Sequence, residues 1–226
     1  MNTDNNNKGH RQRLRDKFLK SGLEGFHDYE IIELLLTIGT PRKDCKSGAK
    51  ESLKKFKTLS GVLGTDQKDL KEINGIGDNN IFGLKISQAV AGRFLKEGIL
   101  NKDFIRSSVE VLRYLKYNLR DKNREVFLVI YLNGRNQILK MEEFFEGTLS
   151  TTAVYLREVV KRALDNNAAA LIFVHNHPSG NLNPSSDDLT ITKKLKEAAK
   201  SIDISVHDHL IIAGDETYSF ADHGIL

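Results

Sequence analysis

At 226 residues, with 39% apolar and 28% charged residues, the chain suits a water-soluble protein of one large domain or two small ones. No apolar run approaches the roughly 20 residues that span a bilayer, Met1–Lys8 does not resemble a secretory signal, and Cys45 is the single cysteine, so a cytoplasmic location without membrane contact is expected. Residues 1–100 carry 18 Lys and Arg against 13 Asp and Glu, a net charge of +5, and residues 101–226 carry −1. That excess is too small to indicate nucleic-acid binding by itself.

The first half of the chain is predicted to be helical. A disordered tail over residues 1–9 precedes a helical domain over residues 10–100. The expected helices are Arg11–Lys20, a helix that Asp28 would cap, Gly48–Phe56, Asp66–Ile73 and Asn79–Phe94. Gly98–Lys102 is expected to be the linker to the second domain.

A glycine turn, Asn74-Gly75-Ile76-Gly77, separates the last two expected helices. It resembles a helix–hairpin–helix, in which turn amides hold a DNA phosphate at a helix N-terminus, so Gly75, Ile76 and Gly77 are candidate DNA contacts. An ordinary helical hairpin is the alternative. Asp78 follows the turn where a Lys or Arg would bind phosphate better, and this favours the alternative.

The second half, residues 101–226, alternates between helical and β-prone segments, which indicates one α+β or α/β domain. Asn133-Gly134 is a hairpin signal, and Val159, Val160 and Leu164 are expected to share one apolar helix face. The expected helices are Ser108–Asn118, Thr152–Asp165 and one within Pro184–Ser201, and the expected strands are Val126–Leu132, Gln137–Phe145, Ala169–Val174, Ile204–Ala213 and Thr217–Phe220.

Two histidines and an aspartate form the candidate metal site. His175 and His177 follow a buried strand two residues apart, so their side chains can point to the same side. Asp188 can face them from the first turn of the next helix. Two neutral imidazoles and one carboxylate leave a fourth position for water, as in a catalytic zinc site. Such a metal lowers the pKa of its water to roughly 7 and polarises a carbonyl.

Other interpretations of these residues stay open at this stage. Ser185-x-x-Asp188 is also a helix-capping pattern, and Asp187 is the second choice as carboxylate ligand. Two His and one carboxylate also bind non-haem iron. His207-Asp208-His209 looks ligand-like, but no third partner is evident, so a structural or orienting role is expected.

The spacing His175-x-His177, seven residues, Ser185-x-x-Asp188 resembles the JAMM (MPN+) metalloprotease motif. The longer string from His175 to Gly180, with Pro184 before the serine, resembles the RadC branch of that family, whose members also carry an N-terminal helix–hairpin–helix region. The resemblance covers about Arg11–Leu226. It implies an all-helical domain followed, over residues 101–226, by a mixed-sheet JAMM/MPN+ domain of the cytidine deaminase-like kind, with one zinc ion per chain.

The resemblance also implies roles for two further residues. A catalytic glutamate is expected at the start of a strand, and Glu125 matches it; the residues alone do not distinguish it from Glu142, Glu143, Glu146 or Glu158. Glu125 would be the general base, and Ser185 would help to stabilise the oxyanion. The chain departs from the family at Leu156, where a proline is usual.

Three functions are compatible with these patterns. The leading interpretation is a zinc-dependent peptidase or isopeptidase-type hydrolase acting on an unidentified protein or peptide. The alternative is a DNA-binding accessory protein in repair or recombination, and a third interpretation combines the two. A metal-dependent nuclease is less favoured, because one carboxylate ligand falls short of the acidic clusters that hold two metals.

Overall fold

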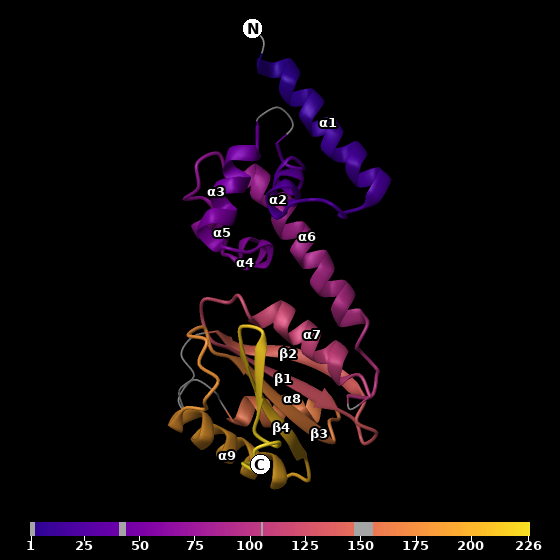
Figure 1. Cartoon of the computed structure of the whole chain (residues 1–226). Helices are drawn as coiled ribbons and strands as arrows, with labels where there is room; N and C mark the ends of the chain where they lie inside the picture. Colours follow the sequence, from indigo (N-terminus) through magenta and orange to yellow (C-terminus); the bar gives the residue numbers. More distant parts are fainter. Residues whose placement is uncertain (1–2, 41–43, 105, 147–155) are drawn as a thin grey trace. The chain divides into compact units, whose positions relative to one another are not determined.

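The computed structural model describes residues 3–40, 44–104, 106–146 and 156–226 (Figure 1). The chain forms two compact units, Met1–Ala91 and Gly92–Leu226. In the described ranges, no helix combines the length and the apolar character that a membrane crossing requires. The candidate metal ligands His175, His177 and Asp188 all belong to the second unit.

The first unit is helical. Its described helices are α1 (Thr3–Ser21), α2 (Asp28–Leu36), α3 (Lys46–Phe56), α4 (Leu59–Gly64), α5 (Gln67–Leu70) and most of α6 (Asp78–Glu97). Helix α1 includes residues 3–9, which were expected to form a disordered tail. Residues 3–9 contain no proline, the residue that most strongly stops a helix. Asp28 does not cap α2 but is its first residue, and the N–H of His27 donates to Glu30 Oε2 at 3.0 Å.

One apolar cluster holds the first unit together. The apolar residues on both sides of the glycine turn, Leu70, Ile73, Ile81 and Leu84, are all buried in it. Helices α2 and α6 approach closely at Gly83, where a Cβ atom would lie 1.9 Å from the Leu35 carbonyl oxygen. Only glycine permits this contact.

The second unit is built on a five-stranded mixed sheet in the order β2-β1-β3-β4-β5. Its strands are β1 (Val126–Leu132), β2 (Ile138–Glu146), β3 (Ala170–Asn176), β4 (Ser205–Ala213) and β5 (Glu216–Ser219). β1 pairs antiparallel with β2 and β3, β3 pairs parallel with β4, and β4 pairs antiparallel with β5. Strand β1 begins and ends at the predicted residues.

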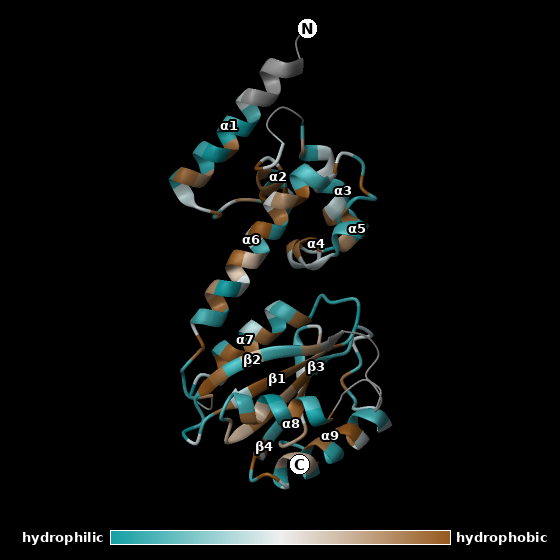
Figure 2. Cartoon of the chain, turned by 180° about the vertical axis from the view of Figure 1, so that it is seen from behind, coloured by the Kyte–Doolittle hydropathy of each residue, from teal (hydrophilic) through white to brown (hydrophobic). Residues whose placement is uncertain are grey.

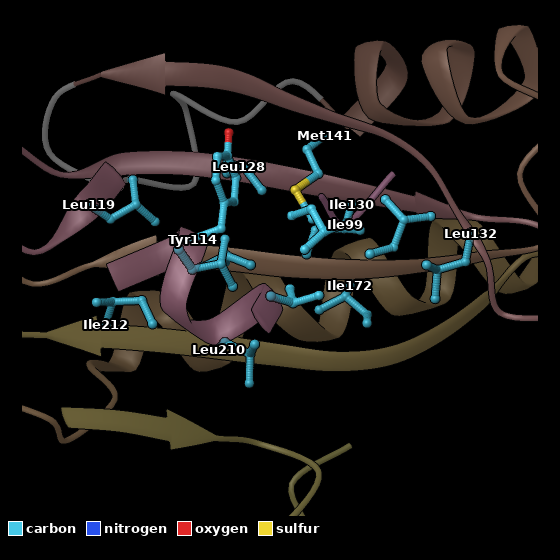
Figure 3. Packing of buried hydrophobic residues seen from close by; sticks show 14 of the residues in the cluster. Ile99, Tyr114, Leu119, Leu128, Ile130, Leu132, Met141, Ile172, Leu210 and Ile212 are labelled. Atoms are coloured by element: carbon cyan, nitrogen blue, oxygen red, sulfur yellow. The ribbon is translucent and has the colours of Figure 1, made fainter. Parts of the chain in front are cut away.

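Helices cover both faces of this sheet. Helix α7 (Ser108–Leu119) covers one face, where Leu128, Ile130 and Ile172 share an apolar cluster with Tyr114 (Figure 3). Helices α8 (Leu156–Asp165) and α9 (Ser186–Lys200) cover the other face, where Phe127 and Phe173 pack. Strand β1 therefore faces an apolar layer on both sides and is hydrophobic throughout (Figure 2).

The boundary between the units lies inside α6 and not in the predicted linker Gly98–Lys102. Ile99 is buried in the apolar cluster between α7 and the sheet. The Asn101 N–H donates to the Ile138 carbonyl at 2.9 Å. The Ile138 N–H donates back to the Lys102 carbonyl at 3.0 Å. The segment is thus hydrogen-bonded to the start of β2 and belongs to the second unit.

Helix α8 differs in part from its prediction. Residues 152–155, expected as its first turn, lie outside the described residues. Val159 is buried, but Leu164 is 54% exposed, and Ala163 takes the inner position. The predicted face of Val159, Val160 and Leu164 is therefore wrong in its last member, because the small Ala163 faces the sheet at the i+4 position.

Candidate metal centre

The end of β3 and the beginning of α9 bring the three predicted ligands together. His175 is the next-to-last residue of β3, and His177 follows the strand. Asp188 lies in the first turn of α9, whose N-cap is Ser185. The His175 and Asp188 residues are 0% and 1% exposed, and the His177 side chain is 10% exposed. The site is therefore reached from the side of His177.

The ligand atoms converge on one point. His175 Nε2 lies 3.2 Å from Asp188 Oδ1, and His177 Nε2 lies 3.4 Å from Asp188 Oδ2. The two Nε2 atoms are 3.0 Å apart. One ligand atom from each of the three residues falls within a mutual distance of 4.8 Å, and within the described ranges this is the one such group of metal-binding side chains.

Hydrogen bonds on the far side of each imidazole determine which nitrogen faces this point. His177 Nδ1 lies 2.6 Å from the Asn181 carbonyl oxygen, which can only accept, so Nδ1 carries the proton. Nε2 of His177 therefore keeps its lone pair. A carbonyl oxygen that fixes the tautomer in this way is typical of metal-bound histidines.

His175 is oriented through a longer chain of hydrogen bonds. The Thr192 hydroxyl donates to the Asp188 carbonyl at 2.5 Å, so it accepts from His209 Nδ1, at 2.6 Å. His209 Nε2 then accepts from His175 Nδ1, at 2.8 Å. The proton of His175 lies on Nδ1, and its Nε2 is free to bind a metal. Complete burial lowers the pKa of His209. His209 therefore stays neutral, and this series of hydrogen bonds requires the neutral form.

The arrangement fits a zinc ion. Two Nε2 lone pairs 3.0 Å apart repel each other unless a proton or a cation lies between them. Burial by itself raises the pKa of Asp188, but the electrostatic influence of the adjacent His175 and His177 and the hydrogen bond from Ser185 outweigh it and hold that pKa below its usual range. The carboxylate is therefore ionised. Two neutral imidazoles and one carboxylate form the donor set of a zinc site with an open fourth position.

Comparison with known proteins shows which family the chain belongs to. The family profile described as RadC-like JAB domain matches residues 105–225, and the one described as UPF0758 N-terminal matches residues 7–82. The chain belongs to the RadC family. The UPF0758 protein of Fusobacterium nucleatum is 37% identical over 99% of this chain and 100% of its own length. The UPF0758 protein of Nitrosospira multiformis is 40% identical over 95% of this chain and 96% of its own length.

Glu125, the glutamate that the RadC resemblance selects, lies just before β1 and is half-buried. Phe127, two residues later, pairs with His175 across the sheet. Because side chains alternate along a strand, Glu125 is expected on the same face as His175 and His177. The hydrogen bond with Asp188 raises the pKa of His177, and the charge of Glu125 raises that pKa further. The side chains of Glu125 and His177 therefore lie within electrostatic range of each other.

Ser185 contacts the site through the carboxylate ligand. Its hydroxyl donates to Asp188 Oδ2 at 2.6 Å. In this arrangement the hydroxyl proton is directed at Asp188 and not at a substrate oxygen. In this RadC-family chain, Ser185 therefore orients the candidate ligand Asp188, and the oxyanion role that the family resemblance implies requires the hydroxyl to turn away.

The other sequence candidates lie apart from the ligands. Asp187 is exposed and does not join the ligand group. His207 is exposed and contacts Asn136 Oδ1 at 2.9 Å. Asp208 accepts hydrogen bonds from Ser219 Oγ and the Ala221 N–H, so it holds the C-terminal turn.

Two further residues that no sequence pattern singled out, Thr192 and Asn176, contact the candidate site. Thr192 lies four residues after Asp188 on α9, and that spacing was a usable signal, since it places both on one helix face. Asn176 gave no signal, because its contacts reach another strand.

The glycine turn lies in the first unit, between α5 and α6. Gly75 has φ +84°, which favours glycine, and Ile76 is 7% exposed inside the apolar cluster. The Gly77 N–H donates to Asn80 Oδ1 at 2.8 Å, and Asn80 Nδ2 donates to the Gly75 carbonyl at 2.7 Å. The Gly77 amide that a phosphate could use is therefore already bonded within the turn.

Proposed function

We propose that the chain is a zinc-dependent hydrolase of the JAMM type that cleaves a peptide or isopeptide bond in a protein or peptide substrate. The supporting observation is the convergence of His175, His177 and Asp188 on one partly accessible point. Glu125 supports it as a charge within electrostatic range of His177. Membership in the RadC-like JAB family supports the same reaction class.

The bound zinc would act as a Lewis acid that lowers the pKa of water to about 7 and polarises the substrate carbonyl. Glu125 would accept a proton from the attacking water and deliver it to the leaving amine. His175, His177 and Asp188 would hold the ion, and the hydrogen bonds behind them fix the nitrogen or oxygen that each one offers.

Metal analysis of the purified protein tests the site itself. We expect one zinc ion per chain, and loss of that zinc in His175→Ala, His177→Ala and Asp188→Ala. His207→Ala and Asp187→Ala are matched controls, because both residues lie outside the ligand group and should leave the zinc content unchanged. Full zinc in all three ligand variants would show that the site assignment is wrong.

Cleavage of a peptide library, with and without a chelator, tests the reaction. The chelator should abolish cleavage. Glu125→Gln should keep its zinc and lose about 10²–10⁴-fold in rate, since it removes the general base and no ligand. A Glu125→Gln variant as active as the parent protein would remove Glu125 from the mechanism.

DNA binding through the first unit is the weaker proposal. The net charge of +5 over residues 1–100 favours it. The Gly77 amide is already bonded to Asn80, and Asp78 follows it, which disfavours a phosphate at this turn. Salt-dependent binding to duplex DNA that weakens in Gly75→Ala and Gly77→Ala would support the proposal, and no binding at low salt would rule it out.

A further inference from the structure

The residue between the two histidines holds the backbone on both sides of Glu125. Asn176 is 1% exposed. Its Oδ1 accepts from the Val126 N–H at 2.7 Å, and its Nδ2 donates to the Arg124 carbonyl at 3.1 Å. The side-chain amide thus bridges the peptide groups before and after Glu125. We propose that Asn176 is a positioning residue that fixes the general base beside the metal ligands, an inference that rests on the proposed function.

Among the described residues, the backbone ladders of the sheet end before Glu125. The backbone pairing of β1 with β3 ends at Phe127 and His175, and the pairing of β1 with β2 ends at Val126. Glu125 lies one residue beyond the β1–β2 ladder and two residues beyond the β1–β3 ladder, where strand ends open readily. The amide of Asn176 takes the place of the next rung between β1 and β3, and so extends the ordered region past Glu125.

An asparagine suits this task because it offers one acceptor and one donor. Aspartate has nearly the same shape, but it would direct a carboxylate oxygen at the Arg124 carbonyl and lose the donated hydrogen bond. Alanine would leave the Val126 N–H and the Arg124 carbonyl without these partners. Both changes keep the ligand side chains intact.

The position of Asn176 in the chain couples the base to the metal ligands. Asn176 is bonded covalently to both His175 and His177, and the His177 N–H donates to the Ile212 carbonyl of β4 at 2.9 Å. The segment from His175 to His177 therefore has two roles. Its first and last residues are the two histidine ligands of the proposed site, and its middle residue, Asn176, positions the proposed general base. Misplacement of a reacting group by about 1 Å can cost roughly 100-fold in rate, so this coupling matters for the chemistry.

Binding of acetohydroxamate to the zinc-loaded full chain, measured by calorimetry, tests the proposal without a substrate. A hydroxamate binds zinc through its oxygens, and a carboxylate placed beside the ion accepts its proton. Glu125→Gln should weaken this binding about tenfold, which is about 1.4 kcal/mol. Asn176→Ala and Asn176→Asp should weaken it similarly while zinc content stays at one per chain. Asn183→Ala, at an exposed asparagine of the loop between β3 and α9, is the matched control.

A double-mutant cycle separates positioning from a general structural effect. If Asn176 acts through Glu125, Asn176→Ala has no further effect on hydroxamate binding in the Glu125→Gln background. Equal losses in both backgrounds, or no loss in the parent background, would overturn the proposal. A parent protein that binds no zinc would overturn the proposed function first, and the inference with it.

Hydrogen exchange of the apo protein gives a second measurement that needs no variant. The Val126 amide, which donates to the Asn176 side chain, should exchange as slowly as the amides inside β1. Exchange of the Val126 amide at the rate of an unstructured peptide would show that the bridge does not form, whatever the metal content.

Discussion

Three hydrogen bonds join Ser185 and Asp188 at the first turn of α9. The Asp188 N–H donates to Ser185 Oγ at 3.1 Å, and the Asp188 carboxylate accepts from the Ser185 N–H and hydroxyl, at 2.7 and 2.6 Å. The first bond caps the helix, and the others aim the carboxylate at His175 and His177. The capping pattern and the ligand pattern are therefore one structure, in which helix capping orients a metal ligand.

Replacing the serine should affect stability and metal binding together. Ser185→Ala removes the N-cap acceptor, so the apo protein should lose about 1 kcal/mol of stability. It also releases one hydrogen bond from Asp188, which should weaken zinc binding by about tenfold or more. Thermal unfolding and chelator competition measure the two effects. Ser186→Ala, with its exposed side chain, should change neither, and a Ser185→Ala variant with unchanged zinc affinity would contradict the orienting role.

The hydrogen-bond chain behind His175 predicts different outcomes for two substitutions of His209. Glutamine can still accept from His175 Nδ1 and donate to Thr192, so His209→Gln should keep most of the zinc affinity. Leucine fills the space among Phe127, Phe173 and Phe220 but offers no acceptor, so His209→Leu should weaken zinc binding about 10–100-fold.

Nitrogen chemical shifts of the apo protein report the same effect directly. They should show the His175 proton on Nδ1 in the parent protein and in His209→Gln, because both provide an acceptor there. Equal zinc affinity of the leucine and glutamine variants would contradict this account of the chain.

Zinc affinity should fall as the pH is lowered from about 8 to about 5.5, because protons compete with the ion for the imidazoles. The hydrogen bond with Asp188 raises the pKa of His177, so competition begins above the ordinary histidine value of about 6.5. In the apo protein, this raised pKa contributes stability that is present below about 6.5 and is lost as the pH rises through the folded-state pKa of His177.

The stabilisation of the protein by added zinc should therefore grow as the pH rises through this window. Asp188, whose pKa is lowered, stays ionised throughout it and adds no pH dependence there. Thermal shifts with and without zinc at several pH values measure the trend, and a zinc-induced shift independent of pH would be the contrary result.

Glu33 in the first unit gives a prediction independent of the metal. Its side chain is 3% exposed, with Oε1 lying 3.0 Å from His10 Nε2, and Oε2 has no hydrogen-bond partner among the described residues. Burial raises the pKa of Glu33, although the contact with His10 lowers it in part. The protonated form is thus favoured by folding, and stability falls as the pH rises from the unfolded-state value through the folded-state pKa.

Glu33→Gln removes this ionisation. It should flatten the pH dependence of the first unit and, by removing a buried charge, stabilise that unit by about 1 kcal/mol at neutral pH. Hydrogen exchange of the Ile32 and Leu36 amides at several pH values measures this. Glu51→Gln, at an exposed position, is the control, and faster exchange in Glu33→Gln at neutral pH would contradict the prediction.

The local patterns of the chain determined much of the fold. The run Val126–Leu132 is confirmed as β1, since a strand buried on both faces is apolar at every position. The spacing of His175 and His177 at a strand end, with Asp188 opening the next helix, already indicated the ligand group that the structure assembles. Glu125 depended on the family resemblance, because a lone glutamate before a strand has no local signature.

The tertiary structure decided what depends on contacts between distant segments. Three sets of hydrogen bonds join residues that lie far apart in sequence. They link Gly98–Lys102 to β2, Thr192 through His209 to His175, and Asn176 to the start of β1. Periodicity and spacing report only which side a residue faces within its own element. Which partner lies on that side is set by strand order and helix placement, and here those placed His209 behind His175 and Asn176 beside the start of β1.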